Sequence, residues 1–217
     1  MNRVLRPPDM TPSNLDHIIL GSGDIERGIA WVEKLTGVLA VFGGVHPGRG
    51  TCNALLQLGP NRYLELVAPD PQQAPQSRYV GLEALREPRL VAWAVRTPDI
   101  LALANTARRA GIPITEPDDG GRARPDGKIL RWKFFRLQDD CGGLLPFFIE
   151  WSPESIHPSA GAPAGCRLER FVLRSAAQAD ITSVCQTLGV EVAVEHREKP
   201  LLRAQISSPK GEVELTS

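Results

Sequence analysis

The sequence has no excess of charge of either sign, because its 217 residues include 25 Lys and Arg and 25 Asp and Glu. Proteins that bind nucleic acid or an acidic membrane surface are typically basic, since they must neutralise phosphate groups. The balance therefore predicts no nucleic-acid partner and no membrane partner. We expect a small-molecule ligand, and a homodimer is left open as the assembly.

Long apolar runs are also missing. No stretch approaches the roughly 20 apolar residues that are needed to cross a bilayer. The first residues, MNRVLRPPDMTPSN, lack the apolar core of a secretion signal. We therefore expect a cytoplasmic protein.

Cysteine is scarce, with four residues that lie far apart and form no Cys-x-x-Cys pair. A disulfide framework or a zinc knuckle needs closer or more regular spacing. We expect four reduced thiols in the core or on the surface.

What the sequence does contain is an internal repeat. LDHIILGSGDI (15–25) and LVAWAVRTPDI (90–100) align without a gap as a strand-like run, a short turn and Asp-Ile, and LERFVLRSAAQADI (168–181) is a looser third copy. Each copy predicts a helix that an aspartate caps and a glycine ends. The pairs are Asp24 with Gly37, Asp99 with Gly111, and Asp180 with Gly189.

Strand-like segments follow each predicted helix, so that each copy reads as a βαβββ module in an α+β chain. The third module is shorter than the others. A segment rich in Pro, Gly and Ala before it reads as a linker. The predicted division is an N-terminal arm (1–14), two modules that together span 15–152 (15–70 and 90–152), the linker (153–166) and the third module (167–217).

This arrangement resembles the vicinal oxygen chelate superfamily of glyoxalases, extradiol dioxygenases and bleomycin-resistance proteins. The resemblance implies that the first two modules pair into a curled sheet that forms a cup. It also implies a tendency to hold a divalent metal in that cup. The segments similar to the glyoxalase-like domain family are LDHI (15–18), HPGRGTCN (46–53), YLELVAPDP (63–71), RPDG (124–127) and PFFIEW (146–151).

The resemblance further implies metal ligands on the first and closing strands of each paired module. These positions map onto His17, Glu65, Ala92 and Glu150, of which His17, Glu65 and Glu150 can bind metal. One imidazole and two carboxylates suit Zn, Mn, Fe(II), Ni or Co. Read from the residues alone, the glutamates fit a solvent-facing strand equally well, and the histidine fits a hydrogen-bonded core. Ala92 cannot bind metal. Either His46 or water takes the ligand position that Ala92 leaves empty, or the site no longer binds metal.

The loop HPGRGTCN lacks the Gly-Lys-Ser/Thr ending of a phosphate-binding loop and leads into a strand, so no nucleotide cofactor is expected. Its glycines suit a bend. His46, Arg49 and Asn53 bring an imidazole, a guanidinium and an amide that can hold a carboxylate or enediolate oxygen. Arg124 and Trp132 are further substrate-binding candidates from the second module, although a partner surface explains them equally well.

The remaining two histidines are given no role. His157 lies in the predicted linker and His196 in the charged run EHREK. We expect both imidazoles to be solvated.

The first functional hypothesis is a metal-dependent enzyme of lyase, isomerase or dioxygenase type that acts on a small oxygen-rich substrate. Glu150 is the predicted proton shuttle, and Glu65 can exchange roles with it. The alternative is a non-catalytic cup that binds a small molecule, as resistance proteins do. A structural role without a ligand is the third reading. The metal, the substrate and the reaction are left open.

Overall fold

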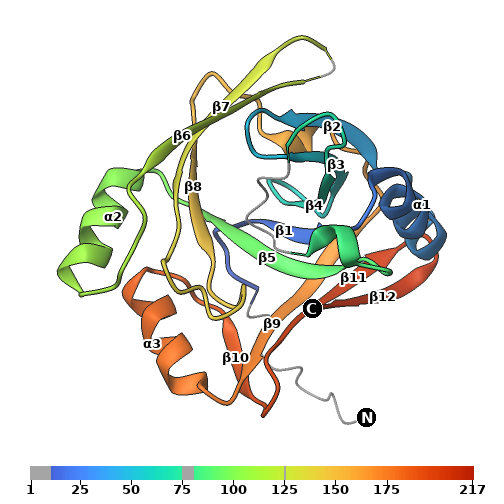
Figure 1. Ribbon diagram of the computed structural model, residues 1–217. Coiled ribbons are helices and arrows are strands. Elements are labelled where there is room, and N and C mark those ends of the chain that lie inside the picture. Colours follow the sequence, from blue (N-terminus) through green and yellow to red (C-terminus); the bar gives the residue numbers. More distant parts are fainter. Residues whose placement is uncertain (1–10, 75–80, 125) are drawn as a thin grey trace.

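An eight-stranded curled sheet carries two helices on its outer side, and a four-stranded sheet with a third helix lies beside it (Figure 1). The computed structural model describes residues 11–74, 81–124 and 126–217. Three parts of the sequence prediction lie outside the described residues. They are positions 1–10 of the N-terminal arm, positions 75–80 between the first two modules, and Pro125 of the RPDG motif.

The first module begins with a strand that is buried along its whole length, as its apolar sequence requires. The helix that follows begins after Asp24, whose carboxylate accepts a hydrogen bond from the backbone N–H of Arg27 at 2.8 Å. It ends at Gly37, which has a φ of 79°. Both predicted caps are confirmed. The elements are β1 (Leu15–Gly21), α1 (Ile25–Thr36), β2 (Val41–His46), β3 (Thr51–Gln57) and β4 (Tyr63–Pro69).

The second module repeats this order after a short 3-10 helix, η1 (Leu82–Ala84). The carboxylate of Asp99 accepts a hydrogen bond from the backbone N–H of Ala102 at 2.9 Å, and Gly111 has a φ of 71° just after the helix. The predicted caps are again confirmed. The elements are β5 (Arg89–Arg96), α2 (Ile100–Arg109), β6 (Asp118–Ala123), β7 (Ile129–Phe135) and β8 (Phe147–Trp151).

The two modules join along their first strands. β1 runs parallel to β4, β5 runs parallel to β8, and β1 pairs antiparallel with β5. The strand order is β2-β3-β4-β1-β5-β8-β7-β6, so each module supplies one half of the curled sheet. The predicted α+β fold, with paired modules that form a cup, is confirmed.

The third module keeps the chain order of the other two but not their strand order. Its first strand lies between its second and third strands, in the order β10-β9-β11-β12. Its helix begins after Ala177, so the prediction that Asp180 is the cap was wrong, and Asp180 lies in the first turn. The elements are β9 (Arg167–Ser175), α3 (Gln178–Thr187), β10 (Ala193–His196), β11 (Leu201–Ser208) and β12 (Gly211–Thr216).

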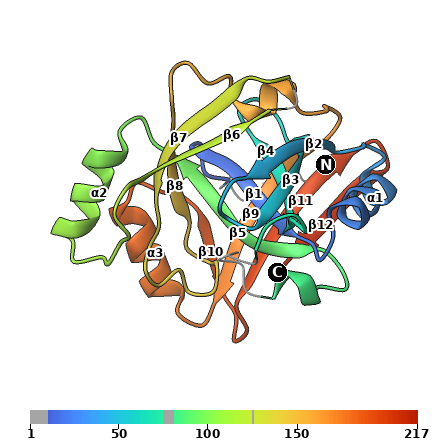
Figure 2. The same ribbon diagram turned by 45° about the horizontal axis from the view of Figure 1, so that its top comes forward.

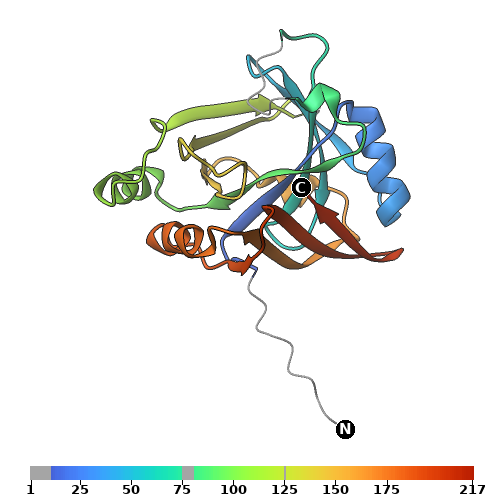
Figure 3. The ribbon, with the colours of Figure 1, turned by 60° about the horizontal axis from the view of Figure 1, so that its bottom comes forward.

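The four-stranded sheet packs against the outer face of the large sheet (Figure 3). Trp93 of β5 contacts Phe171 of β9 with ring centroids 5.1 Å apart, and both side chains are fully buried. The inner face of the large sheet carries a separate apolar cluster that includes Ile19, Ala94 and Ile149. Most of the hydrophobic core therefore lies outside the cup.

The segment between the second and third modules packs against the first module. It contains a short 3-10 helix, η2 (Pro158–Gly161), and its Pro163 carbonyl accepts a hydrogen bond from the backbone N–H of Gln57 at 2.9 Å. The proposed division of the chain into an arm, modules and a linker stays a prediction.

The two edges of the large sheet, β2 and β6, meet and nearly close it (Figure 2). The guanidinium of Arg122 on β6 crosses this seam and donates a hydrogen bond to the carbonyl of Gly43 on β2. At Gly44, whose φ is 138°, a Cβ atom would lie 2.6 Å from the carbonyl oxygen of Ala123. The backbones can approach this closely because Gly44 has no side chain.

Across the described ranges, no helix has the length and apolar character that a bilayer crossing requires. The cytoplasmic location stays a prediction.

Candidate functional site

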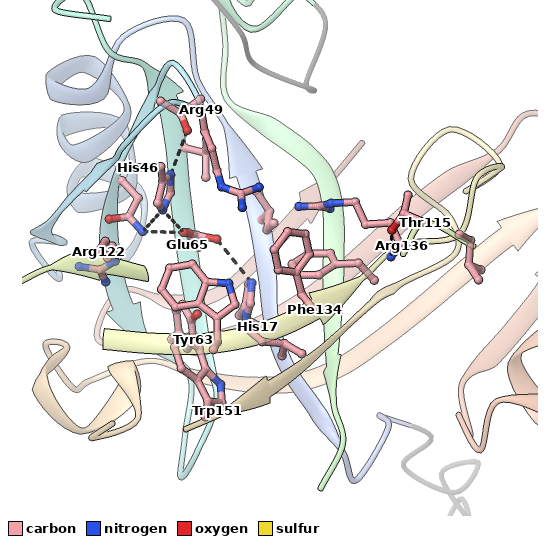
Figure 4. Close-up of a pocket in the computed structure, with 18 of the residues that line it drawn as sticks. His17, His46, Arg49, Tyr63, Glu65, Thr115, Arg122, Phe134, Arg136 and Trp151 are labelled. Carbon is pink, nitrogen blue, oxygen red and sulfur yellow. Dashed lines mark hydrogen bonds and ion pairs between the residues drawn. The ribbon is translucent and has the colours of Figure 1, made fainter. Parts of the chain in front are cut away.

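A cavity of about 520 Å³ fills the cup, and its two walls differ in chemistry (Figure 4). The wall from the first module is polar, whereas the wall from the second module is largely aromatic. The polar side chains are His17, His46, Asn53 and Glu65, and the aromatic ones are Trp132, Phe134, Phe147 and Trp151.

A β-bulge in β1 places Asp16 beside His17. Leu15 pairs with Val95 and His17 with Ala94, so two steps along β1 match one step along β5. The bulge brings the Asp16 carboxylate to the ring of the next residue, and its Oδ1 lies 2.7 Å from Nδ1 of His17. Both side chains are buried.

Asp16 also accepts two hydrogen bonds from residues at and after the end of β8. Its Oδ2 lies 3.1 Å from Nε1 of Trp151 and 3.1 Å from Nε2 of His157. Burial opposes ionisation of Asp16, but the hydrogen bonds with His157 and His17 outweigh it and lower the pKa of the carboxyl below its usual range. An ionised Asp16 requires a proton on Nδ1 of His17 and leaves Nε2 facing the cavity.

The prediction that His157 is solvated was wrong. Its Nδ1 contacts Oγ of Ser159 at 2.8 Å, and its ring meets that of Trp151 edge-on with centroids 5.6 Å apart. The surrounding Pro, Ser and Ala residues predicted a loop, but they gave no sign that η2 packs under the cup. His196, with 63% of its side chain exposed, is solvated as predicted.

Glu65 lies at the centre of the polar wall and is nearly buried. Its Oε2 is 3.5 Å from Nε2 of His17, and its Oε1 is 3.5 Å from Nε2 of His46. Oε1 also accepts a hydrogen bond from Nδ2 of Asn53 at 2.5 Å. One carboxylate thus faces two imidazoles and an amide.

His46 is held as a neutral imidazole. Burial lowers its pKa and outweighs the opposing effect of the Glu65 charge. Its Nε2 lies 3.3 Å from Nδ2 of Asn53, and its Nδ1 lies 2.9 Å from Oγ1 of Thr51. Because the Asn53 amide donates to Nε2, the ring proton is on Nδ1 and points to Thr51.

The contact between His17 and Glu65 has a different character. With its Nδ1 proton committed to Asp16, a neutral His17 turns the lone pair of Nε2 toward Glu65. Two lone pairs at 3.5 Å repel, but one proton between Nε2 and Oε2 makes the contact attractive. The arrangement therefore suits an acid–base pair that holds a single proton.

Six of the predicted site residues line the cavity. His17, Glu65, His46 and Asn53 form the polar contacts above. Arg49 lies at the rim with 40% of its side chain exposed, and Trp132 lies on the aromatic wall. The sequence analysis missed three charged residues in or beside the site, Asp16, Arg122 and Arg136, and also missed the aromatic residues Phe134, Phe147 and Trp151.

Glu150 was predicted as a catalytic residue and metal ligand, and the structure does not place it in the cup. Side chains alternate along β8, so Ile149 and Trp151 line the cavity while Glu150 points outward. Its Oε2 accepts a hydrogen bond at 2.7 Å from the backbone N–H of Ile100, at the start of α2. The predicted placement was wrong, and Glu150 instead caps a helix.

The strand pairing shows why the alignment of the two modules wrongly matched Glu150 to Glu65. Ile19 pairs with Glu65 in the first module, and Ala94, the equivalent of Ile19, pairs with Phe147 in the second. Phe147 therefore occupies the position equivalent to Glu65, three residues before Glu150. An odd offset moves a side chain to the other face of a sheet.

Arg124 was predicted to bind substrate, but it also lies outside the cup. Its Nε is 3.5 Å from Oδ1 of Asp126, and its side chain lines a smaller hollow beside Gly161. Arg122, two residues earlier and still on β6, reaches the cavity instead. Burial lowers the pKa of its guanidinium, although the Glu65 charge opposes the effect.

The predicted three-ligand metal site is not assembled. His17 and Glu65 line the cavity, but Ala92 and Phe147 stand at the matching positions of the second module, and Glu150 is outside. In the part of the chain that the structure describes, no three His, Cys, Asp or Glu side chains are grouped to hold a metal ion. The residues as placed therefore do not fit the predicted site.

Comparison with known proteins supports the fold. A family model described as "Glyoxalase-like domain" matches residues 15–189. A hypothetical protein from Staphylococcus aureus has a similar structure, with a TM-score of 0.64 at 15% identity over 93% of this chain and 84% of that chain. Methylmalonyl-CoA epimerase from Mycobacterium tuberculosis has a TM-score of 0.50 at 23% identity, over 70% of this chain and 96% of that chain. Among curated proteins, no relative matches the sequence.

Proposed function

The chain belongs to the glyoxalase-like domain family of the vicinal oxygen chelate superfamily, and we propose that it is an enzyme of isomerase or lyase type that moves a proton on a small substrate. The observation that carries the proposal is the contact of 3.5 Å between Nε2 of His17 and Oε2 of Glu65, inside a cavity of about 520 Å³. The ionised Asp16 behind His17 fixes which ring nitrogen takes part.

The proposed step begins with Glu65 as the general base. Its carboxylate removes a proton from a carbon next to a carbonyl group, and the C–H electron pair moves to form an enolate. The proton that the pair already shares then rests on Nε2 of His17, where Asp16 stabilises the imidazolium, and His17 can give this proton to the enolate carbon. Asn53 holds Glu65 in position through its hydrogen bond to Oε1. The enolate oxygen gains from nearby positive charge, which Arg122 supplies.

The dependence on a divalent metal stays a separate prediction. Metal would supply Lewis-acid stabilisation of an enolate oxygen, and two of the predicted ligands, His17 and Glu65, line the cavity. Calorimetric titration with Zn, Mn, Ni and Co decides it, with His17→Ala as the test variant. The exposed His196 supplies the control His196→Ala. Loss of metal binding in His17→Ala alone would place the metal in the cup. Identical titrations of the wild type and both variants would contradict the metal prediction.

A second candidate function is ligand binding without catalysis. The aromatic wall favours it, because Trp132, Phe134 and Phe147 offer apolar surface for a bound molecule whether or not chemistry follows. The same cavity therefore serves both candidates, and proton exchange distinguishes them.

Hydrogen exchange with solvent tests the proposed function without knowledge of the product. The protein is incubated in D₂O with a panel of 2-oxo and 2-hydroxy acids, and proton NMR follows the loss of C–H signals. We expect exchange in at least one compound and a loss of about 100-fold or more in Glu65→Gln. The exposed Glu154 supplies the control Glu154→Gln, which should retain the rate. Compounds that bind but never exchange would leave the non-catalytic cup as the function.

A further inference from the structure

The charged side chains that line the cavity do not balance. Among the described residues, three arginines, Arg49, Arg122 and Arg136, line it together with one carboxylate, Glu65. The Glu65 charge interacts with Arg122. The lining of the cavity is therefore positively charged, and a positively charged lining favours an anionic ligand.

Arg49 and Arg136 both stack on the aromatic wall (Figure 4). The Cζ atom of Arg136 lies 4.4 Å from the ring centroid of Phe147 and 5.3 Å from that of Phe134. The Cζ atom of Arg49 lies 4.7 Å from the centroid of Phe134. A guanidinium that stacks through its face keeps its N–H donors at its edge, where a carboxylate binds.

The ion pair that Arg49 makes with a described residue is weak. Its Nη2 lies 3.7 Å from Oδ2 of Asp118, and 68% of the Asp118 side chain is exposed. Surface pairs of this kind contribute little to stability. A ligand carboxylate can therefore replace Asp118 at little cost.

The aromatic wall leads directly to the acid–base pair. The ring of Phe147 meets the ring of His17 edge-on, with centroids 5.5 Å apart. Trp132 and Trp151, whose ring centroids lie 5.4 Å apart, extend the aromatic wall. A planar apolar group that rests on Phe147 thus lies beside the ring of His17.

We propose that the ligand of this cavity is an aromatic carboxylic acid, with its carboxylate at Arg49 and Arg136 and its ring against Phe134, Phe147 and Trp132. The identity of the reacting carbon rests on the proposed function, whereas the recognition of ring and charge does not. The cavity volume of about 520 Å³ suits an acid with one or two rings.

Three simple probes separate the parts of this recognition. Phenylacetate carries the ring and the charge, acetate lacks the ring, and phenylacetamide lacks the charge. Isothermal titration calorimetry should show saturable binding of phenylacetate and at least about ten-fold weaker binding of the other two. Equal affinity for acetate would overturn the role of the aromatic wall, and equal affinity for phenylacetamide would overturn the role of the arginines.

Variants then locate the carboxylate. Arg136→Gln should weaken phenylacetate about ten-fold and leave phenylacetamide unchanged. Arg131 lies on β7, the strand that ends just before Arg136, and is exposed, so Arg131→Gln is the matched control and should bind as the wild type does. Arg49→Gln, at the half-exposed rim, gives an independent reading if Arg136→Gln does not fold. Unchanged phenylacetate affinity in a folded Arg136→Gln or Arg49→Gln would overturn the proposal.

The outcome is separable from that of the proposed function. Phenylacetate binding without proton exchange in any acid would contradict the proposed enzyme activity and support the aromatic-acid site. Exchange that is equally fast in acids with and without a ring would keep the enzyme and overturn this inference.

Discussion

Asp16 gathers hydrogen-bond donors from three places in the chain. His17 is its neighbour in β1, Trp151 ends β8, and His157 lies just before η2. Each donor is satisfied by one ionised carboxylate that is fully buried. An amide in place of the carboxylate would keep one acceptor oxygen and turn the other into a donor, so at least one of these donors would lose its acceptor inside the protein.

Asp16→Asn should therefore destabilise the protein at neutral pH by about 3 kcal/mol, the cost of breaking a buried charged network. Because the pKa of Asp16 is lower in the folded state than its ordinary value, its contribution is complete above about pH 4 and is lost as the pH falls through the folded pKa. Urea unfolding at pH 7, 4 and 3 measures this. The difference between wild type and variant should shrink toward acid pH.

The exposed Asp119 provides the matched change. Asp119→Asn should unfold within about 0.5 kcal/mol of the wild type at pH 7. A difference between wild type and Asp16→Asn that stays constant with pH would show that Asp16 acts by shape and not by charge.

Four polar residues of this site could be predicted from the sequence. The family resemblance pointed to His17 and Glu65, whereas the imidazole and amide groups at the start of a strand pointed to His46 and Asn53. Asp16 could not be predicted, because a strict alternation of side chains places it on the opposite face from His17. The bulge that brings the two together is a feature of strand pairing, which the sequence of one strand does not encode.

At the level of elements, caps and strands were easier to predict than register. Asp24 and Asp99 begin their helices as the repeat indicated. β8 also lies where its apolar sequence predicts, but its offset from β4 depends on the length of the loop before it. Glu150 was therefore assigned to the inner face, which Phe147 and Ile149 occupy.

The close approach of β2 and β6 at their seam predicts the effect of a substitution at Gly44. Gly44→Ala would place a Cβ atom 2.6 Å from the carbonyl oxygen of Ala123, so the two sheet edges must separate. Gly59 also has positive φ, at 116°, but a Cβ there meets no atom within 4 Å. Gly44→Ala should cost about 1–3 kcal/mol more than Gly59→Ala, because only the first adds overpacking to backbone strain. Equal melting temperatures for the two variants would contradict the closed seam.

At the scale of the whole molecule, the third module covers the outer face of the cup, so the chain keeps its core and its site apart. The repeat predicted the chain order of this module. Its strand order differs because β9 pairs with β10 and β11, and a local sequence pattern carries no information about such long-range pairing.

The reactivity of the four thiols tests this packing. Cys52, Cys166 and Cys185 are buried and Cys141 is exposed, in agreement with the expectation of reduced core or surface thiols. Burial raises the pKa of Cys52 to about 11 and that of Cys185 to about 12, so both remain protonated and unreactive at pH 8. A thiol-specific reagent at pH 8 should label one cysteine promptly and the others only on unfolding. Cys141→Ser should remove the prompt phase, and prompt labelling of a second thiol would contradict the packing.

The central claim is that His17 and Glu65 share one proton because Asp16 holds the other nitrogen of the ring. Nitrogen-15 NMR of the four histidines shows which ring nitrogens carry protons, and single His→Gln variants assign the signals. We predict that Nδ1 of His17 is protonated, and that Glu65→Gln changes the Nε2 signal of His17 and leaves its Nδ1 signal in place. An unprotonated Nδ1 on His17, or an Nε2 signal that is unchanged in Glu65→Gln, would contradict the shared proton.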